Sequence, residues 1–232
     1  MSWEDILQCT GVIAKYLIPT LKIFGFTLIF SIPLGMIVAL LKMCRIKPIS
    51  WIINVYILIM RGTPLMLQII TIYYAIPMLK VSGSQLLQGL FANIDTRSDN
   101  YQFTALITAF ALNYAAYFAE IFRGGIESIP KGQYEAAASL GMTKIQTFFR
   151  IVLPQVIKRI VPASSNEVIT LVKDTSLASA IAYAEIFRKA REQMVTYSNL
   201  TPLFIAGIFY FVMNAILTAM FAAVEKKLDY YK

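Results

Sequence analysis

Residues 120–146 read EIFRGGIESIPKGQYEAAASLGMTKIQ, and this stretch says most about the fold of the chain. Pro130 suits the first turn of a helix, because the N–H that proline lacks has no intrahelical partner there. Gly141 stands where a helix commonly ends on a left-handed residue. The spacing therefore predicts a short helix of two to three turns over about 130–140.

The flanks of this short helix separate it from longer apolar segments. Gly124 and Gly125 are expected to end the apolar helix before it. Thr143 and Gln146 form a capping box that opens the helix after it. We therefore expect the short helix to lie outside the membrane as a separate element.

The short helix carries a face of small and apolar side chains. Tyr134, Ala137 and Ala138 recur at helical spacing, and three consecutive alanines at 136–138 allow another protein surface to approach closely. Taken alone, a helix of this kind is more often a packed surface helix than a docking element. The choice between a packed surface helix and a docking element therefore depends on motifs elsewhere in the chain.

The composition is typical of a membrane protein. Of 232 residues, 58% are hydrophobic and only 15% are charged. The absence of histidine removes the commonest general base and metal ligand, and the chain has no GxxxxGK(S/T) phosphate loop. Cys9 and Cys44 have no metal-ligand spacing. We therefore expect no enzyme activity, no metal and no cofactor, and no ATP hydrolysis by this chain itself.

Five stretches are apolar and long enough to cross a bilayer, which takes about 20 residues. They run over about 16–43, 51–79, 101–122, 148–184 and 200–224. The second and fourth exceed one crossing, so each is tilted, broken or partly outside the bilayer, and the fourth is interrupted. The sequence thus predicts an all-α integral membrane protein with about five transmembrane helices and one short cytoplasmic helix, in a single domain over 1–232.

The basic residues indicate how the chain is oriented. The net charge is +8, but the lysines and arginines fall at the ends of apolar runs, which disfavours nucleic acid as a partner. Twelve of the 21 border one set of span ends, six border the other set, and three lie within spans. By the positive-inside rule the N-terminus is outside and the C-terminus is cytoplasmic. The polar segment 81–100 then forms an outer loop.

Polar side chains within the spans are candidates for a transport path. Asn113 lies ten residues before Arg123, roughly 15 Å of helix, and Glu167 lies eight residues after Arg159, roughly 12 Å. If the arginines mark the cytoplasmic boundary, Asn113 and Glu167 reach a similar depth. Tyr117 is one turn from Asn113 on the same face. Together they could hold the charged groups of an amino acid, or simply tie the spans together through hydrogen bonds.

The second span contains a different kind of polar feature. Pro64 frees a backbone carbonyl one turn back and Gly62 weakens the helix, so we expect a bend there. We interpret Arg61, Gly62 and Pro64 as a structural hinge in which Arg61 caps carbonyls or meets an acid. Substrate contact by Arg61 is the minor alternative. Lys173 and Asp174 are expected to mark the break in the fourth span.

Several spaced motifs agree with one known family. Glu135-Ala-Ala, Gly141 and the stretch 151–154 (IVLP) resemble the EAA loop of ABC-importer permeases at every anchor position. The segments NYAAYFAE at 113–120 and RGTPL at 61–65 are similar to the branch of that family that carries polar amino acids. The resemblance covers nearly the whole chain, from about Leu17 to Leu228.

This resemblance implies a type I ABC importer permease fold in a prokaryotic inner membrane. The implied partners are cytoplasmic ATP-binding subunits, a second permease that is a copy or a paralogue, an extracytoplasmic substrate-binding protein, the lipid bilayer and an amino-acid substrate. The short helix would be the coupling helix that contacts the ATPase. The implied coupling residues are Gln133, Glu135, Ala136, Ala137 and Gly141.

In that branch, substrate contacts come from the positions that match Asn113 and Glu167.

Two alternatives come from other classes of protein. An ion-driven secondary transporter would require internal inverted repeats, and none is found between the two halves of the chain. An intramembrane enzyme is disfavoured by the absence of histidine and of paired catalytic carboxylates.

Overall fold

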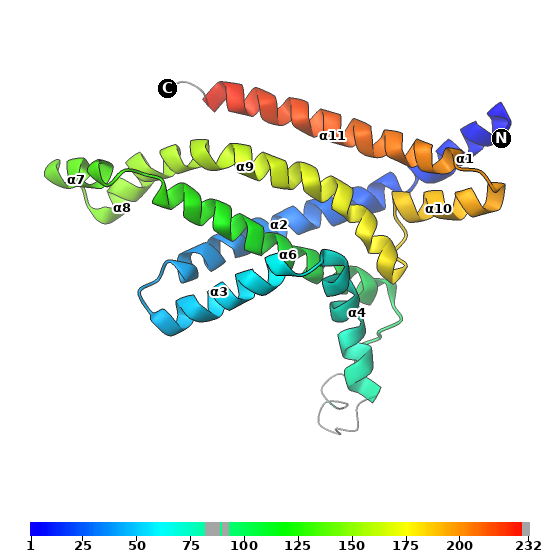
Figure 1. Ribbon diagram of the computed structural model, residues 1–232, viewed down its shortest axis with the longest axis horizontal. Helices are drawn as coiled ribbons and strands as arrows, with labels where there is room; N and C mark the ends of the chain where they lie inside the picture. Colours follow the sequence, from blue (N-terminus) through cyan, green and yellow to red (C-terminus); the bar gives the residue numbers. More distant parts are fainter. Residues whose placement is uncertain (82–88, 90–92, 229–232) are drawn as a thin grey trace.

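The computed structural model describes residues 1–81, 89 and 93–228, and within these ranges every regular element is helical (Figure 1). The predicted outer loop over 81–100 lies partly outside the described residues. In chain order the elements are α1 (Trp3–Ala14), α2 (Leu17–Lys42), α3 (Lys47–Gly62), α4 (Leu65–Val81), α6 (Asp99–Glu127), α7 (Lys131–Ser139), α8 (Lys144–Thr147), a π-helical turn (Phe148–Val152), α9 (Leu153–Asp174), a 3-10 helix (Thr175–Ile181), α10 (Ile186–Tyr197) and α11 (Thr201–Leu228).

Helix α6 is the centre of the packing. It is buried along most of its length, and the main apolar core gathers residues of α2, α3, α4 and α9 around it. Small residues on both sides let the helices approach closely. A Cβ added at Gly35 of α2 would lie 2.7 Å from the Cβ of Phe118, so only glycine fits at this crossing.

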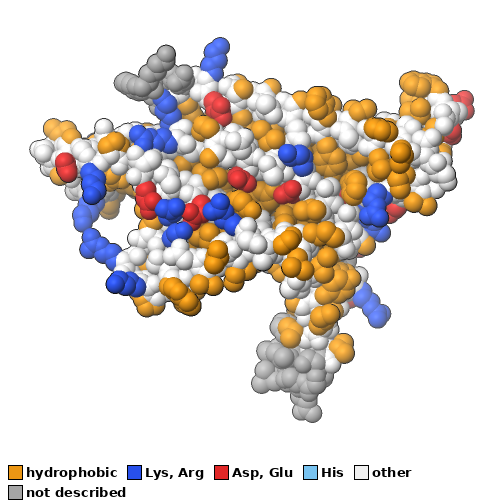
Figure 2. Space-filling model, in the orientation of Figure 1, with side chains coloured by type: hydrophobic (Ala, Val, Ile, Leu, Met, Phe, Trp, Pro, Cys, Tyr) orange, Lys and Arg blue, Asp and Glu red, His pale blue; other side chains and the backbone are white. Residues whose placement is uncertain are grey.

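The outside of the bundle is strongly apolar, as Figure 2 shows for one face. Leu58, Phe204 and Phe211 are each more than 70% exposed, which is expected of side chains that face lipid. Within the described ranges, three helical segments are long and apolar enough to cross a membrane, or four if α3 and α4 form one bent span. Charged side chains exclude α9 from this set, so the predicted total of about five spans stays a prediction.

The predicted span over 51–79 is two helices. Helix α3 ends at Gly62, and α4 starts at Leu65 in a direction that differs by 110°. Thr63 between them is extended, with φ −119° and ψ 149°. The predicted bend is therefore confirmed, and it is sharp because a glycine and a proline flank one extended residue.

Three local features differ from what the sequence predicted. Gly124 and Gly125 do not end their helix, because α6 continues to Glu127. Gly125 instead allows α9 to pack closely, since a Cβ there would lie 2.3 Å from Ile160. Helices α1 and α10 were not predicted, because both are amphipathic and lie outside the long apolar runs.

The predicted break in the fourth apolar stretch is confirmed. Helix α9 ends at Asp174 and continues as a 3-10 helix to Ile181. Ala182 then adopts a left-handed conformation with φ 62°. At the other end of the stretch, the chain enters α9 through the π-helical turn.

Candidate functional site

Helix α7 lies at the opposite end of the molecule from the N-terminus (Figure 1). It ends in a Schellman motif, in which the N–H of Met142 donates to the carbonyl of Ala137 at 3.1 Å and the N–H of Gly141 donates to that of Ala138 at 2.9 Å. Gly141 has φ 70°, so the predicted left-handed cap is confirmed. The loop that follows is thus held in one conformation.

Most residues predicted to couple are on the surface of this loop. Ala137 is 1% exposed and packs inward. The exposed ones are Gln133, Glu135, Ala136 and Gly141. Beside them Tyr134, Leu140 and Ile145 expose 40%, 78% and 71% of their surfaces. A rigid loop with exposed apolar side chains suits contact with another protein, and the coupling role stays a prediction.

Thr143 starts the next helix with the capping box that the sequence predicted. The N–H of Gln146 donates to the Thr143 hydroxyl at 3.3 Å, and the N–H of Thr143 donates to the Gln146 amide oxygen at 2.9 Å. Both ends of the connection between α7 and α8 are therefore fixed by local hydrogen bonds.

At the bend between α3 and α4, side chains take over the role of the missing backbone donor. Pro64 has no N–H, so the carbonyl of Met60 loses its usual helical partner. The amides of Asn113 and Gln68 donate to that carbonyl at 2.8 Å and 3.0 Å. Arg61, which was expected to cap a freed carbonyl, does not do so.

Asn113 is only 4% exposed, and both of its N–H bonds are directed at the protein. Besides Met60, its amide donates to the side-chain oxygen of Gln68 at 3.0 Å. Gln68 also donates to Thr63, at 2.8 Å to the hydroxyl and 3.2 Å to the carbonyl. The network ties α6 to the bend, and a substrate role for Asn113 stays a prediction. Gln68 was missed, although a polar residue one turn after a proline break is a recognisable signal.

Arg61 lies beside the bend with its charge unpaired. Among the residues that the structure describes, it forms neither a hydrogen bond nor an ion pair. Its guanidinium carbon lies 5.2 Å from the centre of the Tyr117 ring, a cation–π distance. Both side chains border an open hollow of about 570 Å³. Its other lining residues are Lys42, Asn54, Ile57, Leu58, Gly62 and Glu120.

Glu167, on α9, is not among the residues that line this hollow. It is half-buried and within electrostatic reach of Arg61, yet the two form no ion pair in the described structure. Tyr114 interacts with both Glu167 and Tyr117, and its hydroxyl donates to Asp174 at 2.7 Å. The structure therefore brings residues of α3, α6 and α9 together. We name Arg61, Tyr117 and Glu167 the central cluster.

Other charges along α2 and α6 are paired. The Lys42 ammonium contacts the Glu120 carboxylate at 2.5 Å, and Arg123 contacts the same carboxylate at 2.8 Å and also Glu127. This set was predicted only as a span boundary. It neutralises itself, so it needs no ligand, and in this it differs from the central cluster.

Glu185 is a buried carboxylate that the sequence predicted only as a residue at a span boundary. It is 0% exposed and caps α10, accepting hydrogen bonds from the N–H groups of Phe187 at 2.7 Å and Arg188 at 2.6 Å. The hydroxyl of Tyr210 donates to it at 2.9 Å. Burial raises the pKa of Glu185 to about 7. Glutamate is uncommon at this helix position, so the signal was weak.

Known proteins resemble this chain over nearly its whole length. Residues 31–230 match the family model of the binding-protein-dependent transport system inner membrane component. The chain belongs to this family. It is 38% identical to the L-cystine transport system permease protein TcyB of Bacillus subtilis, over 93% of this chain and 85% of that protein. It is 40% identical to the arginine transport system permease protein ArtQ of the same organism, over 90% of this chain and 89% of that protein.

Among solved structures, the crystal structure of an amino acid ABC transporter with histidines matches with a TM-score of 0.80 and 35% identity. The match covers 98% of this chain and 99% of that one. The predicted all-α type I permease fold is confirmed by these neighbours. As a member of the family, the chain is a membrane-embedded permease subunit of an ABC transporter and forms the path for the transported molecule.

The family also defines the general partners. Its members work with ATPase subunits, a second permease and a substrate-binding protein, and the separate ATPase subunits hydrolyse the ATP. The alternative of an ion-driven secondary transporter is not supported. This permease is therefore a transporter subunit and not an enzyme.

Proposed function

We propose that this permease passes amino acids through the membrane and binds them at the central cluster. Glu167 contacts the positive group of the substrate, and Arg61 contacts its carboxylate. The observation that carries the proposal is that Arg61 and Glu167 have opposite charges, lie within electrostatic reach of each other, and form no pair with each other or with another described charge at ion-pair distance. Arg61 lies over the Tyr117 ring.

Energetics favour a ligand between these two groups. Removing a charge from water costs several kcal/mol unless a partner compensates it. The nearby Lys42 and Glu120 meet this requirement by direct contact. The half-buried Glu167 has no such contact in the described structure, and Arg61 beside it is exposed. An amino-acid zwitterion carries both missing partners, a carboxylate for Arg61 and an ammonium for Glu167.

The named relatives support an amino acid as substrate. TcyB is named for L-cystine and ArtQ for arginine, and the neighbouring transporter structure contains histidines. These compounds differ in their side chains but share the α-ammonium and α-carboxylate groups. A cluster with one carboxylate and one guanidinium recognises the shared part.

The proposal also includes the side of the membrane on which each terminus lies. With α7 in the cytoplasm, Lys131, Lys144 and Arg150 lie on the side that the positive-inside rule favours. The N-terminus is then outside and the C-terminus inside. In a background that lacks Cys9 and Cys44, a cysteine introduced at Ser139 should react with a membrane-impermeant thiol reagent only from the cytoplasmic side. Labelling from outside would reverse the orientation.

In this orientation α7 contacts the ATPase through its exposed residues, with Glu135, Ala136 and Gly141 at the surface. The second permease is either another copy of this chain or a paralogue. Co-purification followed by mass spectrometry distinguishes the two, because a homodimer returns peptides of one permease only.

The variant Glu167→Gln tests the substrate site, because it keeps the shape of the side chain and removes its charge. Loss of one partly desolvated charge contact should weaken substrate affinity by about 1.5–3 kcal/mol, roughly ten- to a hundredfold. Affinity is measured with radiolabelled L-arginine, L-cystine, L-glutamine and L-histidine on the assembled transporter.

Glu225→Gln is the matched control. Glu225 is a carboxylate on α11 that accepts a hydrogen bond from Ser165 at 3.1 Å, away from the cluster. Its replacement should leave the affinity unchanged. If Glu167→Gln and Arg61→Gln both bind and transport every probe like the unmodified protein, the central cluster is structural.

A further inference from the structure

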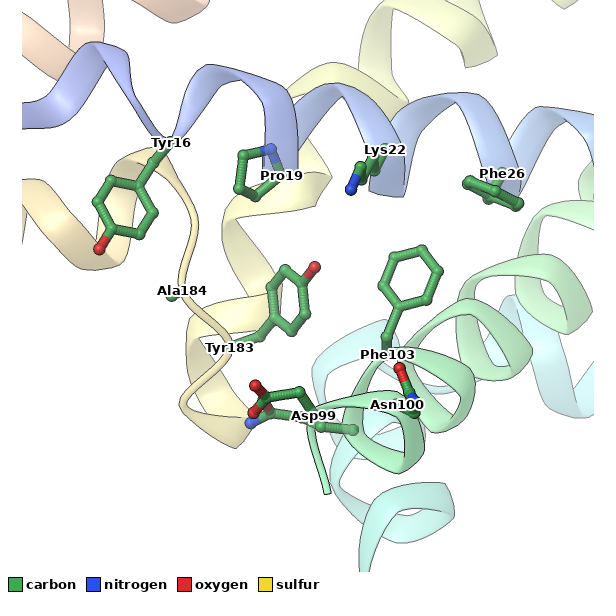
Figure 3. Close-up of a pocket in the computed structure, with 10 residues that line it drawn as sticks. Tyr16, Pro19, Lys22, Phe26, Asp99, Asn100, Phe103, Tyr183 and Ala184 are labelled. Atoms are coloured by element: carbon green, nitrogen blue, oxygen red, sulfur yellow. The ribbon is translucent and has the colours of Figure 1, made fainter. Parts of the chain in front are cut away.

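A second set of unpaired charges lies at the end of the molecule opposite α7. Here α2, the start of α6 and the turn before α10 enclose a pocket of about 510 Å³ (Figure 3). This size is within the range of about 300–1,000 Å³ that is usual for small-molecule sites. We name it the outer pocket. The lining residues that matter here are Lys22, Phe26, Asp99, Asn100, Phe103 and Tyr183.

The polar groups of the outer pocket come from three separate elements. In Figure 3 the ammonium end of Lys22 and the hydroxyl of Tyr183 point into the same space, and Asp99 lies beside Tyr183. Within the described part of the chain, neither Lys22 nor Asp99 forms an ion pair or a side-chain hydrogen bond. One cation and one anion therefore border the pocket without direct partners.

Aromatic rings form the apolar wall of the pocket. Phe26 and Phe103 meet edge to face with ring centres 5.5 Å apart, and Phe103 lies 6.0 Å from Tyr183. The amide of Gln102 donates to the carbonyl of Ile181 at 2.6 Å, which fixes α6 to the 3-10 helix. The aromatic wall therefore belongs to elements that a hydrogen bond holds together.

We propose that the outer pocket binds an α-amino acid zwitterion, with Lys22 at its carboxylate, Asp99 at its ammonium and the rings around its side chain. A simple anion would satisfy Lys22 and be repelled by Asp99, and a simple cation would do the reverse. The choice of an amino acid, and of the outer side of the membrane, rests on the proposed function. The pocket would hold the substrate before it reaches the central cluster.

The test measures how an amino acid protects a cysteine placed at the edge of the pocket. Ala184→Cys supplies the thiol, because Ala184 lines the pocket and is exposed. All variants also carry Glu167→Gln, so that the central cluster contributes little. The assembled transporter, in phosphatidylcholine nanodiscs, is alkylated with an impermeant maleimide with and without L-arginine, L-cystine, L-glutamine or L-histidine. Mass spectrometry of this chain follows the reaction.

At least one of these amino acids should slow alkylation by the factor 1 + [L]/Kd, about fivefold when its concentration is about four times Kd. Lys22→Met and Asp99→Asn should each lower the protection to less than about twofold at the same concentration. Lys15→Met is the matched control, because Lys15 is an exposed lysine outside the pocket, and it should retain full protection. Co-elution of the subunits shows that each variant assembles.

Three results overturn the proposal. Protection that survives both Lys22→Met and Asp99→Asn shows that these charges hold no ligand. Protection that is seen with Ala184→Cys alone, and that disappears when Glu167→Gln is added, assigns the effect to the central cluster. Slow alkylation that requires phosphatidylethanolamine, whose headgroup is also a zwitterion, and no amino acid assigns the pocket to lipid. The proposed function fails separately, if Glu167→Gln leaves uptake unchanged while the outer pocket still shows amino-acid protection.

Discussion

The central cluster and the outer pocket contain the same three kinds of group in different surroundings. Each has one cation, one carboxylate and one tyrosine, drawn from three elements, and in each the two charges are unpaired. In the central cluster Arg61 is exposed and Glu167 is half-buried, whereas both Lys22 and Asp99 of the outer pocket are exposed. At 4 Å a pair of charges interacts by about 1 kcal/mol in water and by about 4 kcal/mol near a protein surface. The central cluster should therefore bind strongly and the outer pocket weakly.

The paired charges at Lys42, Glu120 and Arg123 complete this comparison. Lys42 and Glu120 line the same hollow as Arg61, yet each has its partner within the protein. Charge in an apolar protein is therefore not enough to indicate a site. A charge whose partner is missing is the more specific sign.

Reversing the charge of one residue in each region should produce the largest difference in uptake between the central cluster and the outer pocket. Arg61→Glu places a second carboxylate near Glu167 and removes the contact for the substrate carboxylate, so uptake should fall by more than about a hundredfold. Lys22→Glu makes the equivalent change in the screened outer pocket and should reduce uptake by less than about tenfold. Initial rates of labelled amino-acid uptake into proteoliposomes measure both variants.

The double variant Arg61→Glu with Glu167→Arg is the control for this prediction. It restores opposite charges in exchanged positions, so it should recover part of the lost uptake if the pair acts on a zwitterion. Equal losses in Arg61→Glu and Lys22→Glu would remove the distinction between a strong and a weak site.

The hydrogen bonds at the bend beside the central cluster can be removed while the charged residues of the cluster stay unchanged. Asn113→Ala removes one of the two donors to the Met60 carbonyl and the donor to the Gln68 oxygen, which should destabilise the bend by about 1–3 kcal/mol. Substrate affinity should then fall at the central cluster, while amino-acid protection at the outer pocket is unchanged. Asn166→Ala is the matched control, because Asn166 is exposed and forms no hydrogen bond in the described structure. Loss of protection at both sites would mean that Asn113 supports the whole fold.

Local signals in the sequence predicted local structure well. The left-handed Gly141, the capping box at Thr143 and the bend at Pro64 each depend on a few neighbouring residues, and all three are present. Gly125 was misread because its requirement comes from Ile160, 35 positions away, and not from its own helix. A glycine that allows close packing and a glycine that ends a helix look the same in sequence.

The candidate site was predicted only in part, for a related reason. Asn113 and Tyr117 were placed on one helical face, and the positions are indeed one turn apart. The partner of each, however, is set by the bend: Met60 directs Asn113 inward, and Arg61 is left to cover Tyr117. Which polar residue caps a freed carbonyl depends on helices that meet only in the folded protein.

The smallest predicted effect concerns the wall of the outer pocket, which Glu185 supports. Glu185 follows Tyr183 and Ala184 and fixes the start of α10 through Phe187 and Arg188. Burial raises its pKa to about 7, so between about pH 4.5 and 7 the folded state binds more protons than an opened state. Local stability should therefore fall as pH rises through this window, and be constant above it. The central cluster has no part in this dependence.

Hydrogen exchange at the amides of Phe187 and Arg188 measures this change, corrected for the intrinsic effect of pH. From about pH 5 to about pH 8, protection should fall by roughly tenfold, equivalent to one realised pKa unit. Glu185→Gln retains an acceptor oxygen and cannot ionise, so its protection should not vary with pH. The other groups that face Glu185 are Tyr210 and Arg188. If the unmodified protein and Glu185→Gln show the same pH dependence, Glu185 is already ionised at acidic pH and does not make the wall of the outer pocket sensitive to pH.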